Sequence, residues 1–186
     1  MITIIFETHS TTVDNEAKLA AGWYDVTLSD LGEQQAKQLG ERRADEHFDA
    51  IFCSDLRRSY NTTKLAFGNK FPILQDQRLR ECNYGSLNRT PKADVEAMRE
   101  QALTVPFPEG ESYEGTSQRM KSFLQDLLKD YGGKTVMIVG HRATQYGLDQ
   151  WIKGMSLHDA VLAPWQWQTG WQYEMHSLLR PSYHEL

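Results

Sequence analysis

The chain has 186 residues, 40% of them hydrophobic and 24% charged, which is the composition of an ordinary globular protein with enough residues to bury a core. Its net charge of −5 gives no support to a surface that binds nucleic acid or anionic membranes, and no apolar run approaches the roughly 20 residues that span a bilayer. Because no signal peptide precedes the first apolar run, we expect one domain over residues 1–186, in the cytoplasm, with no membrane or nucleic-acid partner.

Short apolar runs rich in β-branched residues alternate with longer amphipathic segments along the chain. The apolar runs predict strands at residues 2–6, 49–54, 71–74, 135–140 and 170–178. The amphipathic segments predict helices at residues 31–46, 56–67, 92–102, 111–131 and 142–152, with a loop over 11–30. This alternation predicts an α/β fold built around a layered sheet.

Several single residues have expected structural positions. Ser29 or Asp30 is placed to cap the helix at 31–46, and Pro72 puts the strand at 71–74 on the edge of the sheet. Cys53 and Cys82 show no metal or redox spacing, so we expect two free thiols. Four further histidines are expected in structural or exposed positions: His47, His158, His176 and His184. Three tryptophans are expected in the core: Trp165, Trp167 and Trp171.

His9 and His141 each come just after the end of a predicted strand. Ligands of open α/β sheets bind outside the carboxyl ends of parallel strands, so the two imidazoles are expected to meet over one pocket. Two further polar clusters, Ser54 to Arg58 and Leu79 to Glu81, also follow predicted strands. If the four clusters converge, the pocket contains two imidazoles, a guanidinium and a carboxyl group.

Such a pocket suits phosphate chemistry. Arginine and protonated histidine bind phosphate through charge and forked hydrogen bonds. A neutral histidine is a competent nucleophile toward phosphorus, and a protonated carboxyl group can give its proton to the departing oxygen. No second acidic residue accompanies a histidine at metal-ligand spacing, so we expect neither a metal ion nor another cofactor.

At these positions the chain resembles the histidine phosphatase superfamily, the phosphoglycerate mutase-like proteins. The resemblance rests on six segments in the family's order: Thr8-His9-Ser10-Thr11-Thr12 with Asn15, Gly22-Trp23-Tyr24-Asp25, Ser54-Asp55-Leu56-Arg57-Arg58, Leu79-Arg80-Glu81, Gly110-Glu111-Ser112 and Val139-Gly140-His141. It implies a three-layer sandwich with a mostly parallel central sheet.

The resemblance also implies metal-free phosphoryl transfer in two steps. His9 would attack phosphorus and become a phosphohistidine, while Glu81 would serve as acid and then as base for water. Arg58 and His141 would hold the phosphoryl oxygens. The family's substrate-binding positions fall on Ser10, Asn15 and Gly22 as well, and Tyr84 and Lys92 fall where mutases contact phosphoglycerate.

The chain departs from the family pattern beside both histidines. Thr8 and Ser10 replace the arginine and glycine of the first motif, and Arg142 replaces the glycine that follows the second histidine. Losing one phosphate ligand is expected to lower the rate by about 10²–10³-fold. We hypothesise that Arg142 folds over the pocket and supplies the missing hydrogen bonds; the alternative is that it points into solvent.

The first interpretation is therefore a phosphatase that hydrolyses monoesters of small phosphorylated metabolites through His9. A phosphoglycerate mutase is the enzymatic alternative, supported by residues 22–25 and by Lys92. A catalytically impaired phospholigand-binding or regulatory protein is the non-enzymatic alternative, supported by Thr8. The sequence leaves the substrate and the oligomeric state open, and a dimer is compatible with it.

Overall fold

A computed structural model describes residues 1–179. Its central sheet has five strands in the order β4-β3-β6-β1-β7. The four strands β1, β6, β3 and β4 are parallel to one another, and β7 runs antiparallel to β1 at one edge. The strands are β1 (Ile2–Thr8), β3 (Ala50–Cys53), β4 (Ile73–Gln75), β6 (Thr135–Gly140) and β7 (Trp171–Met175).

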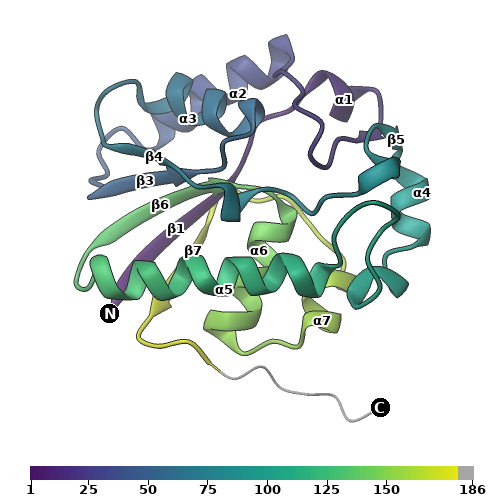
Figure 1. The fold of residues 1–186 in the computed structure, drawn as a ribbon. Helices are drawn as coiled ribbons and strands as arrows, with labels where there is room; N and C mark the ends of the chain where they lie inside the picture. The colour runs from purple at the N-terminus through teal and green to yellow at the C-terminus, as the bar shows by residue number, and fades with distance from the viewer. Residues whose placement is uncertain (180–186) are drawn as a thin grey trace.

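Helices cover both faces of the sheet, which gives three layers (Figure 1). One layer contains α2 (Asp30–Arg42) and α3 (Arg57–Phe67). The opposite layer contains α5 (Tyr113–Asp130), α6 (Arg142–Lys153) and α7 (Leu157–Leu162). The predicted α/β sandwich with a mostly parallel sheet is thus confirmed.

Alternate side chains of the central strands supply the two cores, because successive residues of a strand point to opposite faces. Ile4 and Phe6 of β1 pack with Ile138 of β6 in the cluster that also contains buried residues of α5 and α6. Ile5 of β1 and Met137 of β6 pack on the other side, in the cluster that includes Leu39 of α2. The near-continuous apolar runs of the sequence follow from burial on both faces.

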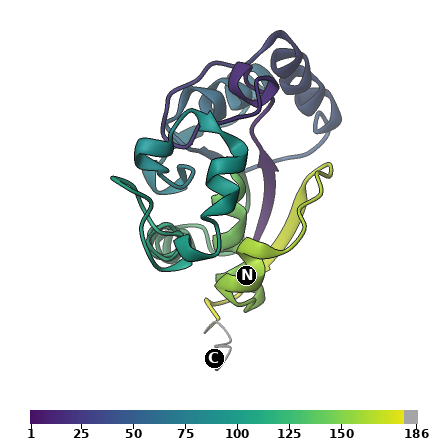
Figure 2. The same cartoon turned by 90° about the vertical axis from the view of Figure 1, so that its right-hand side faces the viewer.

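Smaller elements gather at the end of the sheet where the parallel strands finish, on the right of Figure 1 and facing the viewer in Figure 2. They include α1 (Val13–Glu16), α4 (Lys92–Ala97) and a two-stranded antiparallel sheet formed by β2 (Leu19–Ala20) and β5 (Thr90–Pro91). Three short 3₁₀ helices, at Gln77–Leu79, Gly85–Leu87 and Gln101–Leu103, lie in the connections.

Most predicted elements are present, and the differences lie mainly at this end of the molecule. Ser29 caps α2, since its side chain accepts a hydrogen bond from Gly32 N. The helix predicted over 92–102 is too long: α4 ends at Ala97, and the chain turns so that Ala102 is buried with Val95 and Tyr113 in a third apolar cluster. The predicted loop over 11–30 contains α1 and β2, and α7 was not predicted. No helix within residues 1–179 is long and apolar enough to cross a membrane.

Candidate active site

His9 and His141 lie side by side because they follow directly paired ends of β1 and β6. Thr8 is in register with Gly140, and His9 N donates to Gly140 O at 2.9 Å. The centroids of the two imidazole rings are 5.0 Å apart, as the argument from strand ends predicts. Both rings line a cavity of about 640 Å³ at the carboxyl end of the sheet.

The His9 ring is oriented by its own loop. Its Nδ1 lies 2.7 Å from the carbonyl oxygen of Ser10, and a carbonyl only accepts, so the proton is on Nδ1 and the lone pair is on Nε2. Burial and the neighbouring Arg58 guanidinium lower the pKa of His9 to about 3. His9 is therefore a neutral imidazole with a free Nε2 at physiological pH, which is the form that a nucleophile requires.

His141 is almost completely buried, with 1% of its surface exposed. Its Nε2 lies 2.7 Å from Oγ of Ser54, whereas its buried Nδ1 has no hydrogen-bond partner among the described residues. Burial, followed by the charge of Arg58, holds the pKa of His141 well below its usual value. Ser54 begins the segment Ser54 to Arg58, but no sequence pattern marks its contact with the second histidine.

Arg58 occupies the first turn of α3 with only 2% of its surface exposed. Its Nη1 donates to Tyr24 O at 3.1 Å and its Nη2 to Gly22 O at 2.6 Å. Burial lowers the pKa of the guanidinium, but an arginine remains protonated in proteins. Of the vicinal pair, Arg58 lines the cavity and Arg57 pairs with Asp25 on the surface.

The Glu81 carboxylate reaches the same cavity from the segment before the 3₁₀ helix Gly85–Leu87. Its Oε1 accepts from Cys82 N at 2.8 Å and from Ala143 N at 3.3 Å. Its backbone oxygen accepts from Trp23 Nε1 at 2.6 Å and from Arg119 Nη2 at 2.8 Å. Two side chains from distant segments therefore fix the backbone that presents this carboxylate to the cavity.

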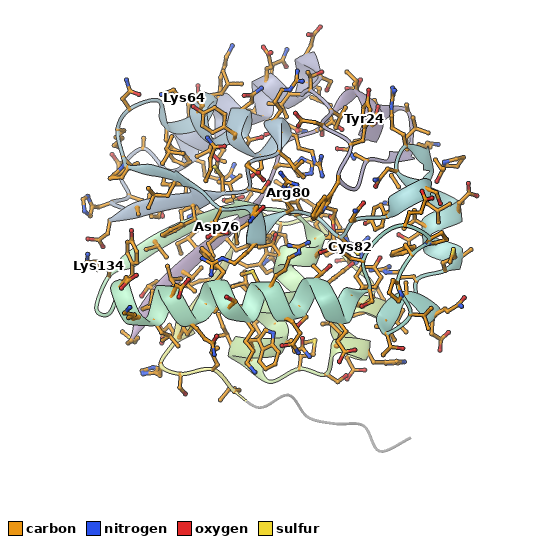
Figure 3. The ribbon with its side chains drawn as sticks, in the orientation of Figure 1. Tyr24, Lys64, Asp76, Arg80, Cys82 and Lys134 are labelled. Carbon is orange, nitrogen blue, oxygen red and sulfur yellow. The ribbon has the colours of Figure 1, made fainter. Side chains whose placement is uncertain are left out.

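Arg119 of α5 organises that segment more widely, and sequence reasoning did not single it out. Its Nη1 donates to Arg78 O at 2.7 Å and to Arg80 O at 2.8 Å, and its guanidinium pairs with Glu111. Glu111 in turn forms two hydrogen bonds with Asn83. Glu111 N donates to Asn83 O at 2.8 Å, and Asn83 N donates to Glu111 Oε2 at 2.9 Å. Figure 3 labels Asp76, Arg80 and Cys82 along this segment, which runs between the α2–α3 layer and α5.

Ser10, Asn15 and Gly22 also line the cavity. Ser10 N donates to Thr62 Oγ1 at 3.0 Å. The Asn15 side chain accepts from Thr12 N at 3.1 Å and so helps to cap α1. Gly22 has a φ of +51°, and a Cβ there would lie 2.0 Å from Oδ1 of Asn88, so this turn next to Arg58 admits no side chain.

Thr8 and Arg142, which depart from the family pattern as Ser10 does, lie on the cavity wall as well. Thr8 ends β1 beside Gly140. Arg142 begins α6, and its guanidinium carbon lies 5.7 Å from the ring centroid of Tyr146 and 5.4 Å from that of Trp165. Its side chain is 24% exposed and lies 3.7 Å from Oε1 of Glu96. It packs on rings at the edge of the cavity, so it does not extend into solvent.

The tryptophan prediction is partly wrong. Trp171 packs against the main core from β7. Trp165 and Trp167 instead line the cavity, and Trp167 is 59% exposed. Both belong to the stretch between α7 and β7 that has no regular structure, so their side chains are not held in a layer of the sandwich. No group of three or more histidine, cysteine or acidic residues in the described part of the chain is placed to hold a metal ion.

The low pKa of His141 has a consequence for stability. The native protein keeps this ring neutral below the ordinary histidine pKa of about 6.5, whereas the unfolded chain takes up a proton there. His141 therefore makes stability fall as the pH drops below about 6.5, by about 1.4 kcal/mol per pH unit. We expect the free energy of unfolding, measured with urea between about pH 7 and about pH 5, to depend less steeply on pH in His141→Gln than in wild type. The difference in slope corresponds to about one proton. Replacement of the exposed His176 by glutamine serves as the control, and an equal slope in His141→Gln and wild type would contradict the prediction.

The fold and the pair of histidines at adjacent strand ends define a phosphoglycerate mutase-like α/β protein. The profile of the histidine phosphatase superfamily (branch 1) matches residues 4–168, and the chain belongs to this superfamily. It is 33% identical over 172 residues to the 2,3-bisphosphoglycerate-dependent phosphoglycerate mutase of Cytophaga hutchinsonii, covering 84% of this chain and 79% of the relative. It is 28% identical over 151 residues to phosphoserine phosphatase 1 of Hydrogenobacter thermophilus, covering 76% and 71%. The solved structure of Bacillus stearothermophilus YhfR superposes with a TM-score of 0.82 at 25% identity, covering 95% of this chain and 96% of that one.

Proposed function

We propose that the protein is a phosphatase that hydrolyses monoesters of small phosphorylated metabolites through a phosphohistidine on His9. The observation that carries the proposal is the orientation of the His9 ring, which lies beside His141 with its Nδ1 bound to Ser10 O and with no hydrogen bond to its Nε2 within residues 1–179. The superfamily to which the chain belongs includes relatives named as phosphatases and as mutases, which supports phosphoryl transfer as the class of reaction.

In the first step, the Nε2 lone pair of His9 forms a bond to phosphorus while the bond between phosphorus and the leaving oxygen breaks. The carboxyl group of Glu81, protonated at this stage, gives its proton to that oxygen. In the second step, water attacks the phosphohistidine, Glu81 takes the proton from the water, and the bond between phosphorus and Nε2 breaks. Inorganic phosphate leaves, and the enzyme returns to its starting state.

Charge on the transferred phosphoryl group needs donors that are already in place. Arg58 is buried beside the histidine pair and uses two of its N–H groups on Gly22 O and Tyr24 O, which leaves the rest of the guanidinium for phosphoryl oxygens. If the Ser54 hydroxyl donates to Nε2 of His141, the proton of His141 is on Nδ1, the buried atom that has no partner among the described residues. A phosphoryl oxygen would supply that partner.

A mutase is the second candidate. The similarity to the Cytophaga mutase favours it, and Tyr84 and Lys92 line the cavity. A non-catalytic phospholigand-binding protein is the third, since Thr8 contributes no cation where the family has an arginine.

Phosphorus NMR of the protein with 3-phosphoglycerate and with phosphoserine separates these candidates. A phosphatase is expected to release inorganic phosphate from at least one of them. Appearance of 2-phosphoglycerate without phosphate release would identify a mutase instead. Unchanged spectra together with saturable binding would identify a binding protein, and both of these results would overturn the proposal.

A further inference from the structure

The cavity has a second cationic wall, away from Arg58. It is built by Arg142 and Tyr146 of α6, Arg99 from the turn after α4, and Trp165 from the stretch after α7. We call this wall, defined by Arg99, Arg142, Tyr146 and Trp165, the α6 wall. Nothing in the two-step reaction above uses it.

The Arg142 guanidinium is held by cation–π contacts and one long ion pair, and not by hydrogen bonds. It lies over the rings of Tyr146 and Trp165, and none of its N–H groups donates a hydrogen bond within residues 1–179. Its nearest carboxylate, Glu96, is 3.7 Å away, which is longer than a hydrogen bond. Arg119 shows the opposite arrangement, because its guanidinium donates to three carbonyls and to Glu111. Arg142 is thus positioned with its donors unused.

The two rings that carry Arg142 are themselves fixed. Trp165 Nε1 donates to Gln145 Oε1 at 2.8 Å. Tyr146 is 6% exposed, and its hydroxyl accepts a hydrogen bond from Arg99. Burial raises the pKa of Tyr146, so the phenol stays neutral and adds no negative charge. Each of the two rings under the guanidinium is thus held by a hydrogen bond, which reduces the ordering that binding of an anion would require.

The wall has more positive than negative charge. Glu96 is shared, with Oε2 bound to Arg99 Nη1 at 3.0 Å and Oε1 facing Arg142. One carboxylate thus faces two guanidinium groups, and Lys92 lines the same cavity. Arg142 also stands in the first turn of α6, which contains no acidic residue, and a cation at a helix N-terminus is electrostatically unfavourable. The local field therefore favours binding of an additional anion.

We propose that the α6 wall binds a second anionic group of the substrate, so that the protein acts on small phosphate monoesters that also carry a carboxylate or a second phosphate. His9, His141 and Arg142 line the same cavity of about 640 Å³, so one small molecule bound in it can place its transferred phosphoryl group at His9 and its other anion on Arg142. Planar, forked guanidinium donors suit both carboxylate and phosphate. This inference rests on the proposed function, and it differs from a role for Arg142 as a ligand of the transferred phosphoryl group.

The test compares two substrates that differ only in the second anion. In 3-phosphoglycerate a carboxylate stands where glycerol 3-phosphate has a hydroxymethyl group. The measured quantity is the ratio of kcat/KM for the first substrate to kcat/KM for the second. Arg142→Gln is expected to lower this ratio by about tenfold or more, the usual loss for one charged hydrogen-bonding partner. Lys153→Gln removes one positive charge from the same helix at a site outside the cavity, and it is expected to change the ratio by less than about threefold.

A parallel comparison of propanediol bisphosphate with propanediol monophosphate shows whether the second anion is a phosphate. If Arg142→Gln slows both members of each pair equally, Arg142 serves the transferred phosphoryl group and the proposal is wrong. An unchanged ratio in both pairs also overturns it. If wild type has no turnover, the same ratios are taken from dissociation constants measured by calorimetry, so the subsite is tested even where the proposed phosphatase activity fails.

Discussion

Replacing His9 by asparagine is expected to lower kcat/KM for a phosphate monoester by about 10⁴-fold or more, because covalent catalysis is lost with the nucleophile. Asparagine keeps a polar side chain of similar length near Ser10 O but has no lone pair that forms a stable bond to phosphorus. Rapid acid quench with a labelled substrate should trap an acid-labile phosphoenzyme on wild type and none on His9→Asn.

His47→Asn provides a matched control, since His47 contacts Phe71 and does not line the cavity. Its kcat/KM is expected to stay within about threefold of wild type. Thermal unfolding of both variants checks that the fold is intact. A phosphoenzyme on His9→Asn, or activity above about 1% of wild type, would show that another residue is the nucleophile.

Arg58→Met is expected to reduce kcat/KM by about 10²–10³-fold, the loss that follows removal of one preorganised donor to the transition state. Methionine fills much of the buried volume but donates nothing to a phosphoryl oxygen. The Arg58→Met variant also leaves Gly22 O and Tyr24 O without the hydrogen bonds that Arg58 donates, so the turn at residues 22–24 loses two hydrogen bonds. We therefore expect KM to rise as well as kcat to fall. Steady-state kinetics with a generic monoester measures both.

The neighbouring arginine offers the control for Arg58. The Arg57 side chain is 59% exposed and pairs with Asp25, and exposed ion pairs contribute little. Arg57→Met is expected to keep kcat/KM within about threefold of wild type. If the two variants lost activity equally, the assignment of Arg58 to the phosphoryl site would be wrong.

The core of the sheet and the histidine pair were predictable from sequence because their signals are local. Ile2 to Phe6 and Thr135 to Gly140 are buried on both faces, which leaves an apolar run followed by a polar residue at the strand end. Parallel pairing then puts His9 beside His141 with no further information. The same logic placed Arg58 and Glu81 at one edge.

Contacts that depend on register or on distant packing were not predictable. Ser54 meets His141 because β3 pairs with β6 in the register that sets Cys53 opposite Val139. In the sequence Arg119 resembles any other charged residue of the amphipathic helix α5. Its guanidinium nevertheless donates to backbone carbonyls of residues 78–81, and no sequence pattern predicts such contacts. Trp165 and Trp167 are predicted in the core because large aromatic side chains are usually buried, but they lie in an irregular stretch that borders the cavity.

The two hydrogen bonds between Asn83 and Glu111 divide the chain into a part that positions the catalytic groups and a closed segment that can vary. Residues 84–110 leave and return at almost the same point, and Arg119 fixes the backbone just before them. Lengthening a loop whose ends are already held together costs only about 0.6 kcal/mol for each doubling. A change of length within residues 92–107 would thus reshape the mouth of the cavity, while Glu81 and the contact of Asn88 with the turn at Gly22 stay in position. Specificity can then diverge in this family by exchange of one closed loop, with the chemical centre inherited unchanged.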